Sequence, residues 1–318
     1  MNMMKHILCA AVVVILLCTA SGCSVKKADD NGSRSGTESA GSEEKVAASA
    51  DDITAGKVTR TGLHALTPVH FAVPDPENAA GLSTKGIGYG FGKASGGKPH
   101  RISVDNQIYF DKFGAFCLDR KSEARDEKAL YLTFDCGYEN GYTKPILDTL
   151  KEKKVPAAFF VTLDYLKSDE GSDMTERMIK EGHIVGNHST THPIFPRISR
   201  TEMAKEIETC DNFLREEFGY TSPYFRFPTG EYSECALNLV NSIGYTSVFW
   251  SLAYLDYDTE KQPDQSSAFK TITERLHPGA VILLHSVSST NARILGDVID
   301  YAREQGYVFR SLDEFPKD

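Results

Sequence analysis

The sequence lacks the basic character of a nucleic-acid-binding protein. Its formal net charge is −9 at pH 7, with 35 lysines and arginines against 44 aspartates and glutamates. Binding to a phosphate backbone needs clustered basic side chains, so we expect no nucleic-acid partner. An acidic chain is still compatible with a neutral polysaccharide as its partner.

Cysteines are also few for a chain of 318 residues, and three of the seven fall within the first 23 residues. The spacing of the other four matches neither a zinc ribbon nor a dense disulfide framework. One disulfide and four free thiols both remain open. The four residues are Cys117, Cys136, Cys210 and Cys235.

The apolar run Ile7–Leu17 is too short for a comfortable membrane span. Because Lys5 and His6 precede it, the run is typical of a secretory signal. The small residues before Cys23 resemble the end of a bacterial lipoprotein signal, in which the cysteine is acylated. We therefore expect residues 1–22 to be a signal peptide and Cys23 to anchor an extracytoplasmic protein to the membrane. An uncleaved anchor and a non-lipidated signal are the alternatives.

The composition then divides the chain into three parts. Residues 23–56 are rich in small and charged side chains and almost free of large apolar ones, which predicts a flexible tether. Residues 57–125 contain a glycine-rich run and scattered aromatics, which we interpret as an irregular N-terminal extension packed on the main domain. Residues 126–318 form that domain, and no internal repeat is visible.

Within the main domain, short apolar runs alternate with segments of helical periodicity. Such alternation predicts right-handed βαβ units and a parallel sheet. No glycine-rich phosphate loop follows any strand, so an incomplete or distorted (β/α) TIM-like barrel is favoured over an open doubly wound sheet. The expected strands are Ala129–Asp135, Ala157–Val161, His183–Asn187, Tyr224–Phe227, Thr246–Trp250, Ala280–His285 and Tyr307–Phe309. The expected helices are Lys144–Lys153, Met174–Glu181, Thr201–Phe218, Glu234–Ile243, Phe269–Leu276 and Asn291–Glu304.

Polar residues gather where these strands end, and in such barrels the chemistry lies at the carboxyl ends of the strands. The five residues at or just beyond an expected strand end are Asp135, His188, Arg226, Asp256 and His285. In addition, His188 and His192 are four residues apart. On one helical turn their rings would point the same way and could bind one divalent cation. Without other evidence, two histidines at this spacing are more commonly capping or surface residues than metal ligands.

Five ordered motifs give the chain a resemblance to the polysaccharide deacetylase family (NodB homology, carbohydrate esterase family 4). They are Thr133-Phe134-Asp135-Cys136-Gly137, His188-Ser189-Thr190-Thr191-His192, Arg226-Phe227-Pro228-Thr229-Gly230, Ala253-Tyr254-Leu255-Asp256-Tyr257 and Leu283-Leu284-His285. The segments Gly137-Tyr138-Glu139-Asn140-Gly141-Tyr142 and His277-Pro278-Gly279-Ala280 are similar to one branch. That branch comprises the δ-lactam-biosynthetic N-acetylmuramic acid deacetylases of spore-forming bacteria.

The resemblance implies a role for each motif residue in amide hydrolysis. Asp135 would be the general base, oriented by Arg226, and His285 the general acid that protonates the departing amine. The respective alternatives are a loop-capping Asp, a salt bridge at the barrel rim and a histidine of the core. Asp256 would raise the pKa of His285.

Three further residues would contact the substrate. The backbone N–H of Thr229 would help to bind the oxyanion. Leu283 and Tyr257 would line the pocket for the acetyl methyl group, with Tyr257 in place of the family's usual Trp. Ala253 stands where many members of the family have an Asp.

The first motif departs from the family at its metal ligand. Most members have a second Asp that completes an Asp-His-His site, and Cys136 takes its place here. A thiolate with His188 and His192 would give zinc a Cys-His-His set with an open fourth position. Alternatively, the two histidines bind the ion with water as the third ligand.

The resemblance thus implies a metal-dependent, zinc-containing N-deacetylase of peptidoglycan glycan strands. Within that class it favours removal of acetyl from N-acetylmuramic acid on the way to muramic δ-lactam in spore cortex. A deacetylase of N-acetylglucosamine in peptidoglycan or a chitin-like chain is the alternative enzyme. A catalytically inactive glycan-binding lipoprotein is the alternative of another class. The sequence does not indicate the oligomeric state.

Overall fold

The computed structural model describes residues 59–60, 64–90, 93–102 and 104–316. The expected signal peptide, Cys23 and the whole of the expected tether lie outside these residues. In the part of the chain that is described, no helix is both long and apolar enough to cross a membrane. The four cysteines at positions 117, 136, 210 and 235 are buried free thiols.

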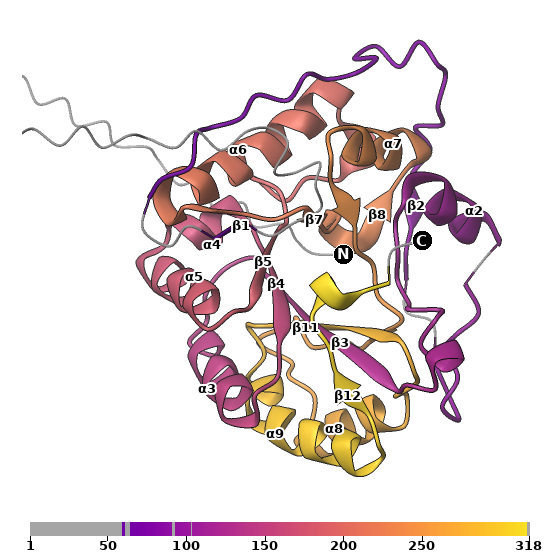
Figure 1. Cartoon of the computed structure of the whole chain (residues 1–318), viewed down its shortest axis with the longest axis vertical. Coiled ribbons are helices and arrows are strands. Elements are labelled where there is room, and N and C mark those ends of the chain that lie inside the picture. Colours follow the sequence, from indigo (N-terminus) through magenta and orange to yellow (C-terminus); the bar gives the residue numbers. More distant parts are fainter. Residues whose placement is uncertain (1–58, 61–63, 91–92, 103, 317–318) are drawn as a thin grey trace, which may run out of the picture. The chain divides into compact units, whose positions relative to one another are not determined.

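The largest sheet is parallel throughout and curls into an incomplete barrel, which confirms the predicted fold (Figure 1). Its first and last strands, β10 and β9, do not pair with each other, so the barrel is open between them. The order is β10 (Leu252–Ala253), β11 (Ala280–His285), β3 (Ala129–Cys136), β4 (Ala157–Val161), β5 (Ile184–Asn187), β7 (Tyr224–Phe225) and β9 (Thr246–Ser247), with β12 (Val308–Phe309) also paired to β3.

Helices surround the outer face of this sheet (Figure 1). They are α3 (Thr143–Lys153), α4 (Leu163–Lys167), α5 (Asp169–Lys180), α6 (Arg200–Phe218), α7 (Glu234–Ser242), α8 (Gln265–Thr273) and α9 (Ser289–Glu304). Short 3-10 turns are η1 (Glu123–Arg125), η2 (Phe195–Arg197), η3 (Pro228–Gly230) and η4 (Leu312–Glu314). The ends of α6 follow from its sequence. Ser199 and Glu202 form a capping box at its start, and Gly219 ends it with φ of 57°.

Strand β3 separates two layers of the core. Alternate side chains of a strand point to opposite faces. Leu130, Leu132 and Phe134 therefore pack outward against the helices, in the same cluster as Leu147 of α3. Tyr131 packs in a second cluster inside the barrel. Asp135 shares this inner face, which directs its carboxylate toward the mouth of the barrel.

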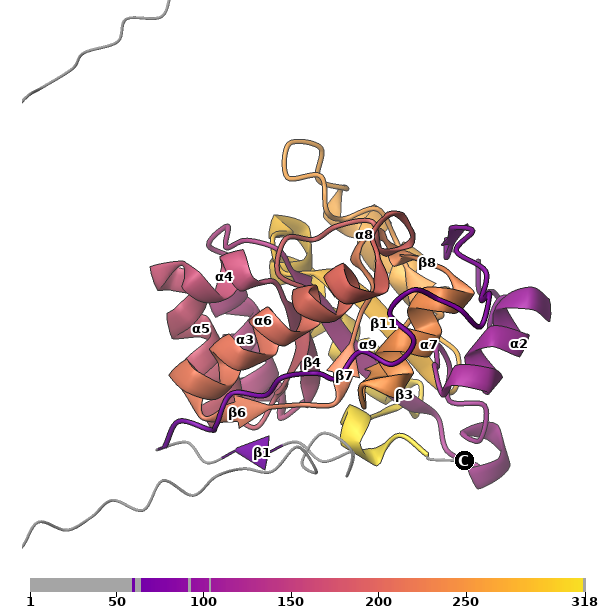
Figure 2. The same cartoon turned by 90° about the horizontal axis from the view of Figure 1, so that it is seen from above.

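The N-terminal extension is less irregular than predicted, because it contains helix α2 (Val104–Phe113). Only Phe110 and Phe113 of this helix are buried. Its sequence therefore lacks the regular apolar stripe from which an amphipathic helix is predicted. Figure 2 shows α2 beside α7. In addition, strand β2 (Ile87–Gly88) pairs antiparallel with β8 (Glu231–Tyr232), directly after the third motif.

Further contacts bind the extension to the barrel. Phe116 bridges to the open edge strand β9: its N–H donates to the carbonyl of Ser247, and the N–H of Phe249 donates to the carbonyl of Phe116. Along α6, Asn212 exchanges two hydrogen bonds with the backbone of Val69, at 2.7 and 2.8 Å. A second two-stranded sheet joins β1 (Thr59–Arg60) to β6 (Tyr220–Thr221).

Candidate active site

The polar residues expected at strand ends all lie at the carboxyl edge of the parallel sheet. Asp135 is the penultimate residue of β3 and His285 the last of β11. His188 directly follows β5, Arg226 directly follows β7, and Asp256 comes three residues after β10. Because parallel strands end at one edge, the fold brings these five side chains to one place.

Asp135 is held by a buried arginine. Its Oδ1 accepts a hydrogen bond of 2.8 Å from Nη1 of Arg226, which is fully buried and also donates from Nε to the carbonyl of Val248 at 3.0 Å. The guanidinium lies over the ring of Phe160. Burial acts to raise the pKa of Asp135, but the charges of Arg226, His188 and His285 outweigh it and hold this pKa below its ordinary value. The carboxylate therefore stays ionised and can accept a proton.

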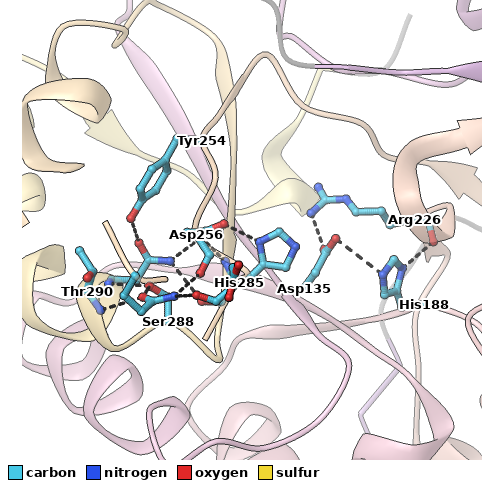
Figure 3. Close-up of polar contacts among 11 residues, drawn as sticks. Asp135, His188, Arg226, Tyr254, Asp256, His285, Ser288 and Thr290 are labelled. Atoms are coloured by element: carbon cyan, nitrogen blue, oxygen red, sulfur yellow. Dashed lines mark hydrogen bonds and ion pairs between the residues drawn. The ribbon is translucent and has the colours of Figure 1, made fainter. Parts of the chain in front are cut away.

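His285 is the register partner of Asp135 on the adjacent strand. Its Nδ1 contacts Oδ1 of Asp256 at 2.7 Å, and its backbone N–H donates to Oδ2 of the same carboxylate at 2.7 Å (Figure 3). Burial acts to lower the pKa of His285, but the charge and hydrogen bond of Asp256 raise it above its ordinary value overall. This arrangement favours a protonated imidazolium beside the carboxylate of Asp135.

His188 and His192 face each other, but the expectation that they share a helical turn is wrong. The segment after β5 is a loop in which Ser189 and His192 have φ of 72° and 56°. The two rings still meet edge to face, with centroids 4.9 Å apart. Nδ1 of His188 lies 2.8 Å from the carbonyl of Arg226, to which it donates, so Nε2 keeps its lone pair. Nε2 lies 3.7 Å from Oδ2 of Asp135.

Burial keeps this histidine pair neutral. It lowers the pKa of His188 to about 4 and also lowers that of His192, in each case against the opposing charge of Asp135. Neutral imidazole is the form that binds a metal ion. The donor chemistry of the pair therefore fits a divalent cation.

Cys136 does not join this pair. Its side chain packs on the outer face of β3, in the core cluster that contains Phe134 and Tyr165. The residue is fully buried, and burial raises the pKa of its thiol far above the ordinary value. Among the described residues, no three His, Cys, Asp or Glu side chains are placed to hold one metal ion. The structure thus does not assemble the Cys-His-His set that the sequence suggested.

A glutamate that the sequence interpretation missed anchors the histidine loop. Oε2 of Glu206, on α6, accepts hydrogen bonds from the N–H groups of Thr190 and Thr191 at 3.0 and 2.7 Å. The side-chain amide of Asn187 also donates to the carbonyl of Ile207 at 2.9 Å. These contacts join the loop that carries both histidines to α6. The other oxygen of Glu206, Oε1, accepts from the hydroxyl of Thr191 at 2.8 Å. No sequence pattern identifies Glu206, because its partners lie 15 and 16 residues away and two of the three donors are backbone N–H groups.

The three residues expected to contact substrate lie in different settings. Thr229 is exposed within η3 and has φ of 58°, a left-handed conformation that is rare for a β-branched residue. Leu283 is buried two residues before His285, on the same face of β11. Tyr257 is exposed, and its ring lies edge-on to His285 with centroids 5.6 Å apart. The structure therefore brings Tyr257 and Leu283 next to the imidazole.

Comparison with known proteins identifies the family. The family described as polysaccharide deacetylase matches residues 122–248, which include Asp135, both histidines of the pair and Arg226. The chain is 35% identical to the peptidoglycan-N-acetylmuramic acid deacetylase PdaA of Bacillus subtilis, over 74% of this chain and 88% of that protein. The chain belongs to the polysaccharide deacetylase family. It is therefore a hydrolase of the class that cleaves N-acetyl amide bonds of carbohydrates.

Another relative and two solved structures are also similar to this chain. An uncharacterised 30.6 kDa protein of Geobacillus stearothermophilus is 43% identical over 74% of this chain and 87% of its own length. The solved structure of B. subtilis PdaA, a family 4 carbohydrate esterase, matches with a TM-score of 0.69 and covers 74% of this chain and 98% of that one. A family 4 carbohydrate esterase from Bacillus anthracis, 38% identical, matches with a TM-score of 0.61 over 74% of this chain and 97% of its own.

Proposed function

We propose that this deacetylase removes the acetyl group from N-acetylmuramic acid residues of peptidoglycan, on the way to muramic δ-lactam in spore cortex. The observation that carries the hydrolytic part is the pairing of Asp135 with His285 on adjacent strands, beside two neutral imidazoles. The choice of muramic acid rests on the similarity to PdaA over most of both chains.

In this proposal, Asp135 acts as the general base. Arg226 holds the carboxylate anionic and orients it, so that it takes a proton from the attacking water. The water oxygen then bonds to the carbonyl carbon of the acetamido group, and the carbonyl π electrons move to its oxygen. The N–H of Thr229 donates to that oxyanion, while Leu283 and Tyr257 enclose the methyl group.

His285 completes the reaction as the general acid. Its imidazolium, stabilised by Asp256, gives a proton to the nitrogen as the C–N bond breaks. The products are acetate and a free amine on the sugar. His188 and His192 are the residues that would hold a divalent metal, for which we propose zinc. When bound, such an ion lowers the pKa of water and polarises a carbonyl group.

The substrate is tested by mass spectrometry of glycan strands whose stem peptides have been removed. Incubation with the protein should remove acetyl from muramic acid and leave glucosamine acetylated. Loss of acetyl from glucosamine alone would reject the muramic acid proposal and leave the reaction class standing. No loss of acetyl from either sugar, together with retained glycan binding, would support an inactive glycan-binding protein instead.

We also propose that residues 1–22 are a signal peptide and that the protein acts outside the cytoplasm, anchored to the membrane through a lipid on Cys23. The small residues before Cys23 support this proposal. In spore-forming cells, the proposed cortex substrate would place it in the intermembrane space of the forespore. Substituting Cys23→Ala should release the protein from the membrane fraction and abolish labelling by a radioactive fatty acid. A variant that stays in the membrane fraction would contradict lipid anchoring.

A further inference from the structure

A buried chain of hydrogen bonds continues from His285 through Asp256 to helix α9. Asp256 is fully buried and has a partner for each oxygen: Oδ1 contacts Nδ1 of His285, and Oδ2 accepts from the N–H of His285 and from Nδ2 of Asn291 at 2.6 Å. Tyr254 then donates its hydroxyl to Oδ1 of Asn291. The chain therefore links the segment after β10, the end of β11 and the first turn of α9.

The contacts of Asn291 fix the orientation of its amide. Nδ2 donates to Oδ2 of Asp256 and, at 3.1 Å, to the carbonyl of His285, whereas Oδ1 accepts from Tyr254. A flipped amide would place its oxygen against two acceptors and its NH₂ group against the Tyr254 hydroxyl. The backbone of Asn291 is held as well, because its N–H donates to the N-cap residue Ser288 at 3.0 Å. The side chain is almost fully excluded from solvent, so water cannot replace its donors.

We propose that Asn291 is a positioning residue for the general acid, and that Tyr254 in turn orients Asn291. This inference rests on the proposed role of His285. By occupying Oδ2 of Asp256, the Asn291 amide prevents rotation of the carboxylate and directs Oδ1 at Nδ1 of His285. It thereby presents Nε2, the nitrogen that donates the proton, toward the mouth of the barrel. Asn291 lies outside all five sequence motifs.

The first test replaces the amide with an apolar group of similar size, Asn291→Leu. We expect kcat for acetate release to fall by about 10- to 100-fold, the range for loss of a residue that orients a metal-binding histidine, with KM changed less than about twofold. In proton NMR, the downfield signal of the His285 Nδ1 proton should shift or vanish. The matched control is Thr290→Val. Thr290 is equally buried on the same turn but donates to the carbonyl of Pro263, so its loss should leave both readouts unchanged.

A second variant, Tyr254→Phe, tests the same role if Asn291→Leu does not fold. Tyr254→Phe removes one hydroxyl, and we expect a fall in kcat of several-fold with the same NMR change. Unchanged kcat and an unchanged Nδ1 proton in either folded variant would overturn the positioning role. The parent proposal is tested separately by His285→Ala. If His285→Ala keeps its activity, the general-acid role of His285 is wrong. If His285→Ala loses activity while the Asn291 and Tyr254 variants keep theirs, only the positioning role of Asn291 is wrong.

Discussion

Asp135 and His285 are register partners on the adjacent parallel strands β3 and β11, and the N–H of Ser286 donates to the carbonyl of Asp135 at 3.2 Å. Neighbouring strands lie about 4.8 Å apart, so this register places a carboxylate and an imidazole within reach of one amide group.

Substituting Asp135→Asn should lower kcat by at least about 100-fold, because the amide cannot accept the proton of water. Stability should also fall, because loss of one partner of a buried ion pair costs roughly 3–5 kcal/mol. Acetate release by the folded fraction, defined by circular dichroism, is the measurement. Asp211→Asn is the matched control, since it breaks the buried pair of Asp211 with Arg215 on α6. It should lower stability without changing the activity of folded protein.

Asp256 should set the alkaline limb of the pH profile. Because the pKa of His285 is raised above its ordinary value of about 6.5, the acid stays protonated to higher pH and activity declines only beyond that raised pKa. In Asp256→Asn the stabilising charge is lost while burial of the ring remains. The alkaline limb of kcat/KM should therefore move to lower pH. Asp258→Asn, an exposed change in the same loop, should leave it in place.

The thiol of Cys136 should contribute to packing and not to metal binding. We expect Cys136→Ser to lower stability by roughly 1–3 kcal/mol, because it buries a hydroxyl among apolar side chains. Zinc content, measured by elemental analysis, should equal that of the unmodified protein. Cys210→Ser provides a control from the same core cluster. Selective loss of zinc in the Cys136 variant would show instead that this thiol is a ligand.

The histidine pair should hold the metal. His188→Gln and His192→Gln should each weaken zinc retention by at least about tenfold during dialysis against a weak chelator. His183→Gln is the control, since the Nδ1 of this buried histidine accepts from the N–H of Ala157, at the opposite end of the strands. Equal metal content in all three variants would refute the proposed pair.

Gly230 should be needed for the conformation of the loop that carries Thr229. Its φ is 67°, and an added Cβ would lie 2.7 Å from the indole of Trp250. We therefore expect Gly230→Ala to destabilise the protein by roughly 1–3 kcal/mol in urea unfolding and to lower kcat. The neighbouring Gly88 offers a matched control, because a Cβ there meets nothing within 4 Å. Gly88→Ala should change stability by no more than about 0.5 kcal/mol.

Much of the barrel could be predicted from the sequence because its central strands are fully buried. Strands β4 and β11 have the predicted bounds, and β3 extends only one residue further. Strand β10 was missed because its two residues, Leu252 and Ala253, show no periodicity. The pairing of Asp256 with His285 depends on β10 lying beside β11, which no local pattern indicates.

Two features of the site differ from what the motifs suggested, and their causes are different. The loop around His188 and His192 depends on positive φ at Ser189 and His192, a conformation that these residue types do not predict. By contrast, the outward direction of Cys136 follows from strand alternation, since Asp135 points inward and the next side chain must point to the other face. Strand geometry therefore favours the alternative in which the two histidines bind the ion with water as the third ligand.

The bridge formed by Phe116 has a consequence for shortened versions of the protein. A protein that begins at residue 126 would retain every motif. It would lack Phe116, so the backbone groups of Ser247 and Phe249 would lose their hydrogen-bond partner. An uncovered strand of this kind recruits strands from other molecules. Such a truncated protein should precipitate or self-associate during purification, although its catalytic side chains are all present.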